Sequence, residues 1–399
     1  MLFGILNVYS VELGKENFRI HNFFSSYAAK QLVCLGLSIL VCFLIANTNY
    51  NFIQFLIPAA YFCNIALLLF TKFSGKSIYG HNSWLKIGPF NLQPAEFAKM
   101  TTALFIAQIF NYKDIKLNVY KIIKSSFCIL LPTLIIASQG DIGSCLVFSS
   151  FSIVFLRENY LVKLILFASY VIFSIVLSLF CSKIYISIGI ISLVIIMSIR
   201  YLNQPMKILY SNIFGILTYV ICHGTNFFVY NFLKPHQRDR VISWIDPERD
   251  ILGIGWNATQ SKIAIGSGGL FGKGFLQGTQ TKYGFVPEQH TDFIFCTIGE
   301  EYGFWGSILF ILAFCILIGL IFMVSEKSSY RFTRIYGYGV ASILFFHFII
   351  NVGMTIGLFP IIGIPLPFVS YGGSALMSFV IMVFLFLKFN YSDKVYMRK

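Results

Sequence analysis

The chain has 399 residues, of which 57% are hydrophobic and 12% are charged, and its mean hydropathy is +0.76. A soluble domain cannot bury that much apolar surface, so the composition excludes a soluble globular protein and predicts a multi-spanning membrane protein. The formal net charge is +14. The basic residues are spread over short loops instead of lying on one face, so we expect no nucleic-acid partner. Nine cysteines lie scattered without a CxxC pair and are expected to be small hydrophobic residues.

Apolar runs of nearly 20 residues predict an all-α fold, a polytopic transmembrane bundle of about 10–12 spans. We expect a single integral membrane domain over 1–399. Residues 1–9 resemble the end of one further span, so we expect them to be a truncated first span. The other spans are expected at 30–47, 52–72, 94–110, 122–138, 141–157, 161–180, 184–200, 210–232, 302–323, 335–358 and 369–388.

Basic residues mark every second loop: 111–124, Arg157 with Lys163, Arg200 with Lys207, 327–334 and the tail 388–399. Because the alternation of spans places all five on one side of the membrane, the positive-inside rule predicts that this side is cytoplasmic. The loops 73–93 and 233–301 then face outward. The long outward loop is expected to hold a functional site, since it is too long for a simple connector.

Asp292, in the segment PEQHTDFIF, is the first candidate in that loop. One interpretation is a carboxylate that favours a helix N-terminus, with Thr291 as the N-cap. The other is a general base at the membrane surface, with His290 as an alternative base or a supporting partner. A helix over residues 291–324 would measure roughly 50 Å, so we expect a break near Gly299–Gly303 that leaves Asp292 at the outer surface.

Glu96 and Lys99, in QPAEFAK, open the span at 94–110 and share a helix face because they are three residues apart. They form either a structural ion pair or the lining of a polar cavity, since ionisable groups inside a membrane are costly unless paired or functional. Pro94 is expected in the first turn of this helix.

Arg238 and Arg240, in HQRDRV, have the fork geometry that suits diphosphate oxygens, although anchoring to lipid headgroups explains them equally well. Trp84 in the other outer loop is either an interfacial anchor or a substrate contact. The glycine-rich run 266–278 lacks the pattern of a P-loop or of a dinucleotide fold, and close backbone packing is the favoured interpretation. The segment PLPFVSYGGSA (365–375) predicts irregular backbone at membrane depth that is buried or lines a cavity.

These motifs together resemble the SEDS family of bacterial cell-wall proteins, the RodA, FtsW and SpoVE group. The matching segments are GHNSWLKIGPFNLQPAEFAK, QGDIGS, HQRDRV, the block from NATQSKIAIG to HTDFIF, GEEYGFWG, and NVGMTIGLFPIIGIPLPFVSYGGSA. They span residues 30–390 in the family's order. The segment GKGFLQGTQT is more similar to the elongation member of the family than to the division member.

The resemblance implies a peptidoglycan glycosyltransferase that polymerises lipid II and works with a class B penicillin-binding protein within the elongation machinery. It implies a bacterial cytoplasmic (inner) membrane location with the active site on the outer face. The essential Asp of the family maps to Asp292. The family's Glu and Lys map to Glu96 and Lys99, with Ala95 in place of the usual Ser, and its Trp maps to Trp84. Ser370, in the last motif, is expected among the substrate-binding residues.

The sequence departs from the family pattern in two places. The family begins with a complete first span, so the start of this chain is expected to be either misassigned or shortened, and 161–232 is expected to hold two extra spans. The resemblance further implies inverting transfer, with release of undecaprenyl diphosphate. We expect Arg238, Arg240, Lys262 or a divalent cation (Mg or Mn) to stabilise the leaving group. A lipid II flippase without chemistry, or a scaffold, would explain the spans as well. Eight of the sixteen acidic residues lie in 239–301, which favours the enzyme.

Overall fold

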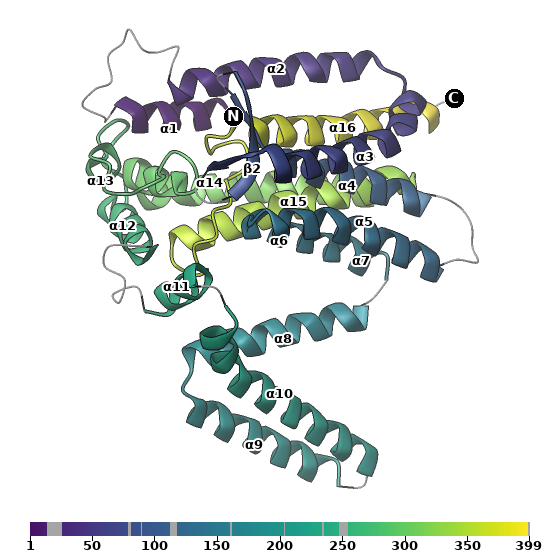
Figure 1. Cartoon of the computed structure of the whole chain (residues 1–399), viewed down its shortest axis with the longest axis vertical. Helices are drawn as coiled ribbons and strands as arrows, with labels where there is room; N and C mark the ends of the chain where they lie inside the picture. Colours follow the sequence, from purple (N-terminus) through teal and green to yellow (C-terminus); the bar gives the residue numbers. More distant parts are fainter. Residues whose placement is uncertain are drawn as a thin grey trace. The chain divides into compact units, whose positions relative to one another are not determined.

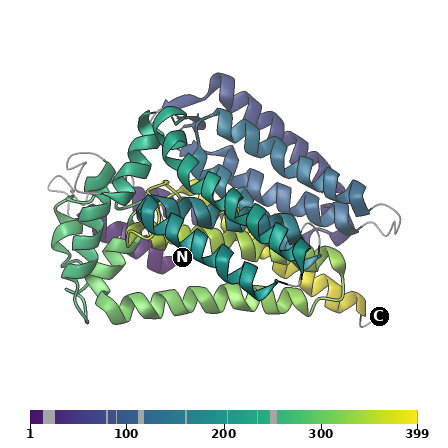
Figure 2. The same ribbon diagram turned by 90° about the horizontal axis from the view of Figure 1, so that it is seen from below.

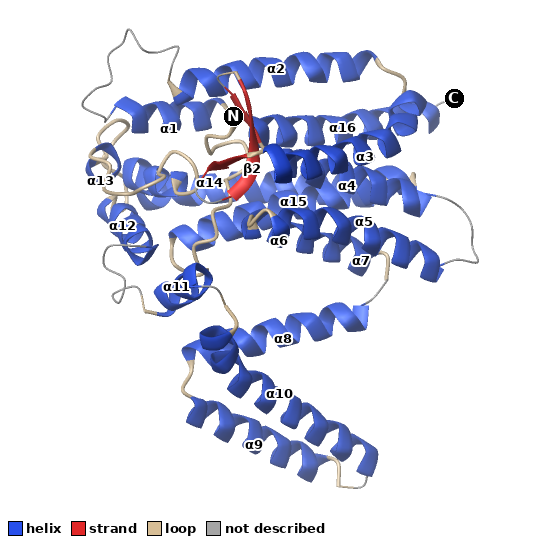
Figure 3. Cartoon of the chain, in the orientation of Figure 1, coloured by secondary structure: helices blue, strands red, loops and turns tan. Residues whose placement is uncertain are grey.

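The computed structural model describes residues 1–13, 26–78, 81–88, 90–111, 118–159, 162–202, 204–233, 235–246 and 254–397. They fall into two compact units, Met1–Arg157 with Asn257–Lys399, and Glu158–Trp256. The described residues are mostly helical (Figure 3), as the sequence predicts.

The first unit is a bundle whose long helices run side by side in both views (Figure 1, Figure 2). Its helices are α1 (Leu2–Leu13), α2 (Tyr27–Asn47), α3 (Tyr50–Ser74), α4 (Pro94–Asn111), α5 (Asn118–Ser138), α6 (Ile142–Phe148), α7 (Ser152–Arg157), α12 (Ile254–Ser267), α13 (Thr279–Lys282), α14 (Ile294–Glu326), α15 (Arg331–Thr355) and α16 (Gly373–Met397). A 3₁₀ turn, Ser149–Phe151, joins α6 to α7. Helix α12 begins just before the first unit's second segment.

The second unit contains α8 (Val162–Phe180), α9 (Lys183–Arg200), α10 (Pro205–Asn231) and α11 (Pro235–Ile245). Helix α10 packs against both α8 and α9, and Tyr170 stacks on Phe214 with ring centroids 4.3 Å apart. The three spans expected between 161 and 232 are therefore all helical.

Among the described residues, nine helices are long and apolar enough to cross a membrane: α2, α3, α5, α8, α9, α10, α14, α15 and α16. All correspond to expected spans. The expected spans 94–110 and 141–157 are helical but are not among the nine, and α1 is a shorter apolar helix of 12 residues. At 1.5 Å per residue, α1 is about 18 Å long.

Helix α4 is less apolar because it lies inside the bundle, against α3, α5, α15 and α16. Fourteen of its 18 residues are buried, and it begins at Pro94 as predicted. A helix surrounded by protein does not need an apolar surface for lipid, so it can carry polar side chains.

A small antiparallel sheet, which the sequence analysis did not predict, lies between α3 and α4 (Figure 3). Its strands are β1 (Lys76–Ile78), β2 (His81–Ile87) and β3 (Phe90–Leu92), in the order β1-β2-β3, with Leu85 paired to Leu92. The Ser374 hydroxyl accepts from the Gln93 amide (3.1 Å) and donates to Asn91 O (3.3 Å). This contact fixes the end of the sheet against the start of α16.

Two basic residues expected on the cytoplasmic side lie at the same end of the first unit, each with its own partner. Arg157 at the end of α7 makes a bidentate pair with Glu326 at the end of α14 (2.8 and 2.5 Å). At the same end of the bundle, Lys388 donates to Ala46 O at the end of α2 (2.6 Å). The sheet and the start of α14 lie at the opposite end (Figure 1).

Helix α14 is interrupted at Gly303, where φ is 68° and ψ is −162°. The sequence predicted this break. The glycine-rich run lies against it: Lys273 N and Gly274 N donate to Glu300 O and Glu301 O (both 3.0 Å), and Phe304 N donates to Gly269 O (2.9 Å). A Cβ on Gly272 would lie 2.2 Å from Glu301 O, so the run serves close backbone packing, as expected.

Candidate active site

Asp292 lies in a tight turn directly before α14. Glu288 begins the turn with φ 52°, and its carbonyl oxygen accepts from Thr291 N (3.1 Å) and Phe293 N (3.2 Å). The Thr291 hydroxyl donates to the Glu288 carboxylate (3.0 Å), and the N-cap is Phe293. The predicted N-cap, Thr291, was therefore wrong, because the turn uses its hydroxyl and delays the helix start to Ile294.

Three successive carbonyl groups of this turn are held from outside it. Tyr371 N donates to His290 O (2.9 Å), the Ser370 hydroxyl to Thr291 O (2.5 Å) and the Asn351 side-chain amide to Asp292 O (2.8 Å). The half-buried Asp292 side chain therefore projects from a backbone that α15 and the α15–α16 connector keep in place.

The connector 356–372 has the irregular backbone predicted for its motif. Asn351 also donates to Ile364 O (2.6 Å), and Ser370 Oγ accepts from Leu366 N (2.8 Å). Gly363 has φ +81°, and a Cβ there would lie 3.2 Å from Asp292 Oδ2. The missing side chain at Gly363 thus leaves room for the Asp292 carboxylate.

Helix α12 packs against the same turn and presents Lys262. Ala264 belongs to a buried cluster with Val286, Phe293 and Cys296, and the Ser261 hydroxyl donates to Thr355 O (2.9 Å). The exposed Lys262 side chain crosses the connector at Gly357, where a Cβ would lie 2.2 Å from Lys262 Cε. The predicted base and one predicted cation therefore both lie along the connector.

His290 is stacked on Tyr27 at the start of α2, with ring centroids 4.6 Å apart and an interplanar angle of 12°. Tyr371 lies against both rings. Burial, with a smaller effect from the neighbouring Tyr27, raises the pKa of Tyr371 to about 12, so its phenol stays protonated near neutral pH. The alternative role of His290 as a base stays a prediction.

Glu96 and Lys99 form the expected ion pair inside the bundle (Oε1 to Nζ, 2.7 Å), and both are 1% exposed. Lys99 Nζ also lies 2.8 Å from Nε2 of His347 on α15, which is equally buried. Sequence reasoning missed His347 and Asn351. The signal was present, because both are polar residues within an apolar span, four positions apart and so on one helix face.

The other predicted residues lie on different elements. Trp84 is half-buried on β2. Ser370 is 6% exposed and holds the turn through its hydroxyl. Arg238 and Arg240 lie on α11 in the second unit, where Arg238 Nε is 3.9 Å from Asp239 Oδ1.

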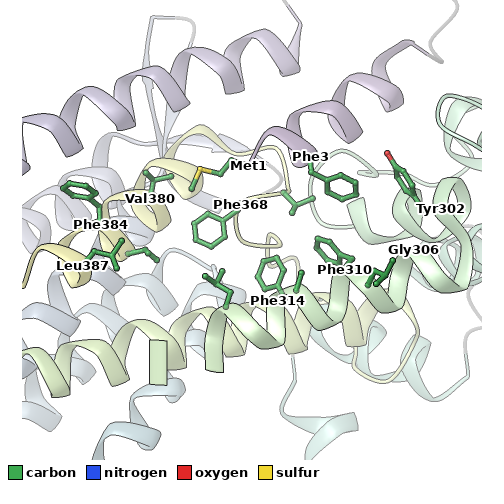
Figure 4. A pocket seen from close by; sticks show the side chains of 15 residues that line it. Met1, Phe3, Tyr302, Gly306, Phe310, Phe314, Phe368, Val380, Phe384 and Leu387 are labelled. Carbon is green, nitrogen blue, oxygen red and sulfur yellow. The ribbon is translucent and has the colours of Figure 1, made fainter. Parts of the chain in front are cut away.

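An apolar pocket of about 750 Å³ lies beside the connector (Figure 4). Its walls come from α1, α14 and α16 and from Phe368 and Val369, which directly precede Ser370. Labelled side chains include Phe3, Phe310, Phe314, Val380, Phe384 and Leu387 (Figure 4). Such a lining suits a hydrocarbon chain, because it offers apolar surface and few polar partners.

The sequence model of the FTSW_RODA_SPOVE family, described as "Cell cycle protein", matches residues 1–198 and 185–394. The chain belongs to this family. It is 31% identical over 419 residues to the peptidoglycan glycosyltransferase RodA of Treponema pallidum, covering 97% of this chain and 94% of the relative. It is 32% identical over 320 residues to the peptidoglycan glycosyltransferase MrdB of Escherichia coli K12, covering 80% and 74%.

Solved structures share the FTSW_RODA_SPOVE fold. A chain from a structure on the coordination of polymerization and crosslinking by a peptidoglycan synthase complex superposes with a TM-score of 0.65 at 24% identity, covering 97% of this chain and 96% of that one. The rod shape determining protein RodA of Thermus thermophilus superposes with a TM-score of 0.58 at 20% identity, covering 98% and 93%. These likenesses confirm the predicted polytopic helical fold.

Proposed function

We propose that this chain is a peptidoglycan glycosyltransferase that polymerises lipid II during cell elongation, with Asp292 as the general base. Its relatives in the FTSW_RODA_SPOVE family are named for this activity. The observation that carries the assignment is the turn at Asp292, where three consecutive carbonyl oxygens are held and the carboxylate faces the connector. Such preorganisation is what a base needs to meet an acceptor hydroxyl in a fixed geometry.

The reaction is a direct displacement with inversion. The acceptor's 4-hydroxyl oxygen attacks the anomeric carbon of the donor's muramic acid, which is α-linked to diphosphate, and a β-1,4 bond forms. Asp292 takes the proton of that hydroxyl as the bond forms. Undecaprenyl diphosphate leaves with the bonding electrons. The remaining predicted substrate contacts are Trp84, Glu96, Lys99, His290 and Ser370.

The charge that develops on the diphosphate needs cations. Lys262 is exposed beside the connector that also meets Asp292, and Arg238 and Arg240 are the further proposed contacts. A divalent cation, Mg²⁺ or Mn²⁺, is part of the proposal. Within the described ranges no group of three or more His, Cys, Asp and Glu side chains is arranged to hold a metal ion. Such an ion would take its ligands mainly from diphosphate and water, as Mg²⁺ commonly does.

The undecaprenyl chains are proposed to lie against apolar surfaces of the bundle, and the pocket in Figure 4 is one such surface. The proposed partner is a class B penicillin-binding protein, since a chain of similar fold belongs to a peptidoglycan synthase complex. We place the protein in the bacterial inner membrane with the Asp292 end outward. The opposite end carries Arg157 and Lys388, as the positive-inside rule requires of a cytoplasmic face.

The test uses the purified protein with its penicillin-binding partner and labelled lipid II, in detergent with Mg²⁺ or Mn²⁺. Glycan products are separated on a gel for the wild type, Asp292→Asn and Asp292→Ala, with Glu326→Gln, at the opposite end of the bundle, as an exposed-carboxylate control. Polymer from the wild type and the control, but not from the two Asp292 variants, supports the proposal. Wild-type rates from a folded Asp292→Ala protein would remove the base assignment.

A lipid II flippase is the second candidate function. The observation that favours it is the buried group of Glu96, Lys99 and His347 inside the bundle, because transporters place essential charges there. Movement of labelled lipid II across sealed vesicles, without polymer under any of the conditions above, would favour the transporter.

A further inference from the structure

We propose that His347 is a positioning residue that links the buried Glu96–Lys99 ion pair to the turn carrying Asp292. The link runs through the carbonyl group of Pro365 in the connector. This inference rests on the proposed function, because its kinetic readout is the polymerisation reaction assigned to Asp292.

The protonation pattern of His347 follows from its two contacts. Its Nδ1 lies 3.0 Å from Pro365 O. A carbonyl oxygen only accepts, so Nδ1 carries the proton and donates. Nε2 lies 2.8 Å from Lys99 Nζ, an ammonium that only donates, so Nε2 holds a lone pair and accepts. The ring is therefore neutral, and each nitrogen has its own distinct partner.

The surroundings leave His347 little freedom to turn. The ring meets Phe379 edge-on, with centroids 4.9 Å apart and an interplanar angle of 83°. The same Phe379 ring lies 5.8 Å from Lys99 Nζ. The Ser378 hydroxyl on α16 donates to Glu96 O (2.7 Å), which ties α16 to the start of α4. Helices α4, α15 and α16 thus fix the orientation in which His347 donates to Pro365 O.

His347 and Asn351 act on adjacent carbonyl groups of the connector. They lie four residues apart on α15 and so on one face of that helix. His347 donates to Pro365 O, and Asn351 donates to Ile364 O at 2.6 Å. Asn351 donates at the same time to Asp292 O at 2.8 Å. A shift of Pro365 therefore displaces Ile364, and with it the amide that holds Asp292.

The connector also lies beside the Asp292 side chain. Gly363 precedes Ile364, and a Cβ added at Gly363 would lie 3.2 Å from Asp292 Oδ2, so the carboxylate lies next to this part of the connector. A movement of a few tenths of an ångström at 364–365 would change that distance. The ion pair, although placed inside the bundle, thereby sets the geometry of the carboxylate through His347.

The second carboxylate oxygen of Glu96 predicts that substitutions at Lys99 and His347 are coupled. Glu96 Oε2 is buried and has no hydrogen-bond partner among the described residues. The ammonium of Lys99 is therefore shared between one Glu96 oxygen and His347. When the Nε2 acceptor of His347 is removed, the Lys99 ammonium can shift toward Glu96 Oε2. The effect of a His347 substitution on turnover should therefore depend on whether Lys99 is present.

The test compares variants that separate the two contacts. In the His347→Asn variant the amide can reach Pro365 O but not Lys99, whereas in His347→Gln it can reach Lys99. His223→Asn, a histidine on α10 in the second unit, is the matched control. Turnover and KM for labelled lipid II are measured per folded molecule, in complex with the penicillin-binding partner.

We expect both His347 variants to lower turnover about tenfold while KM changes less than about twofold, and His223→Asn to match the wild type. We expect Lys99→Met with His347→Asn to be no more than about twofold slower than Lys99→Met alone, because coupled positions are not additive. Losses that multiply would overturn the link, as would turnover within twofold of the wild type in both His347 variants.

Amide hydrogen exchange of the peptide containing 288–293 supplies a readout independent of activity. We expect faster exchange there in His347→Asn and in Lys99→Met, and unchanged exchange in His223→Asn. If the wild type does not polymerise lipid II, the proposed function fails, and exchange alone decides the coupling. Unchanged exchange in the first two variants would then overturn it.

Discussion

The side-chain amide of Asn351 donates to the main-chain carbonyl of Asp292 across 2.8 Å, although the two residues are 59 positions apart in the chain. The same amide group donates to Ile364 O. A single buried side chain therefore joins the turn before α14 to the connector between α15 and α16.

We expect Asn351→Ala to leave the carbonyl groups of Asp292 and Ile364 without this donor, at a cost of about 2–6 kcal/mol in stability, since each unsatisfied group costs ~1–3 kcal/mol. Thermal unfolding in detergent measures the loss, and turnover per folded molecule should fall as well. Ser342→Ala, on the same helix, is the control, because its hydroxyl only donates within α15 to Gly339 O. Equal melting temperatures for the two variants would contradict the prediction.

A methyl group at Gly363 should act on the Asp292 carboxylate. The added Cβ would lie 3.2 Å from Oδ2 and would also strain a backbone at φ +81°. We expect Gly363→Ala to lower turnover at least about tenfold, or ~1.4 kcal/mol in the barrier. Gly284→Ala shares the strain, at φ +72°, but meets nothing within 4 Å. Similar turnover in both variants would show that the crowding does not matter.

The buried carboxylate of Glu300 should matter far more for stability than the exposed one of Glu326. Glu300 accepts from the main-chain amides of Thr279, Gln280 and Thr281 at the start of α13 and pairs with Lys273 at 2.7 Å. We expect Glu300→Gln to lower the free energy of unfolding by about 3 kcal/mol. The side-chain NH₂ group of glutamine would face main-chain amides or the Lys273 ammonium, which are themselves donors, so these groups would lose their acceptor.

The matched control is Glu326→Gln, which loses the pair with Arg157, where the two side chains are 50% and 35% exposed. Exposed pairs contribute ~0–1 kcal/mol, so its melting temperature should stay close to that of the wild type. A control variant as unstable as Glu300→Gln would refute the contrast.

Lys262 should assist the leaving group without supporting the fold. We expect Lys262→Gln to lower turnover about 100–1,000-fold, the range typical of one lost electrostatic contact to a developing charge, with an unchanged melting temperature. Lys282→Gln, an exposed lysine on α13, should behave as the wild type. Full activity in Lys262→Gln would exclude the contact.

The spans could be predicted because each is a continuous apolar run, and the break in α14 because glycines and adjacent glutamates interrupt one. The sheet could not. Its outer strands are three residues long, and its last strand is fixed by Ser374, 283 positions away along the chain. Local sequence does not contain that contact.

Only part of the candidate site could be predicted, because local sequence shows charged residues but not the tertiary contacts around them. Asp292, Glu96 and Lys99 were visible as charges next to or inside apolar runs. His347 satisfied the same criterion, but its importance depends on Pro365, a carbonyl group that no side-chain pattern reveals. The positions of His290, Ser370 and Asn351 around one turn likewise arise from tertiary packing.

The break at Gly303 has a mechanical consequence. A bent helix loses main-chain hydrogen bonds at the bend, and here the loop before it replaces them in both directions, with Lys273 and Gly274 donating to α14 and Phe304 and Trp305 donating back. Main-chain hydrogen bonds on both sides of the break therefore hold the loop 268–274 against the helix that starts just after Asp292. In the proposed reaction a glycan strand advances after each addition, and these hydrogen bonds would keep the loop aligned with the Asp292 turn from one sugar addition to the next.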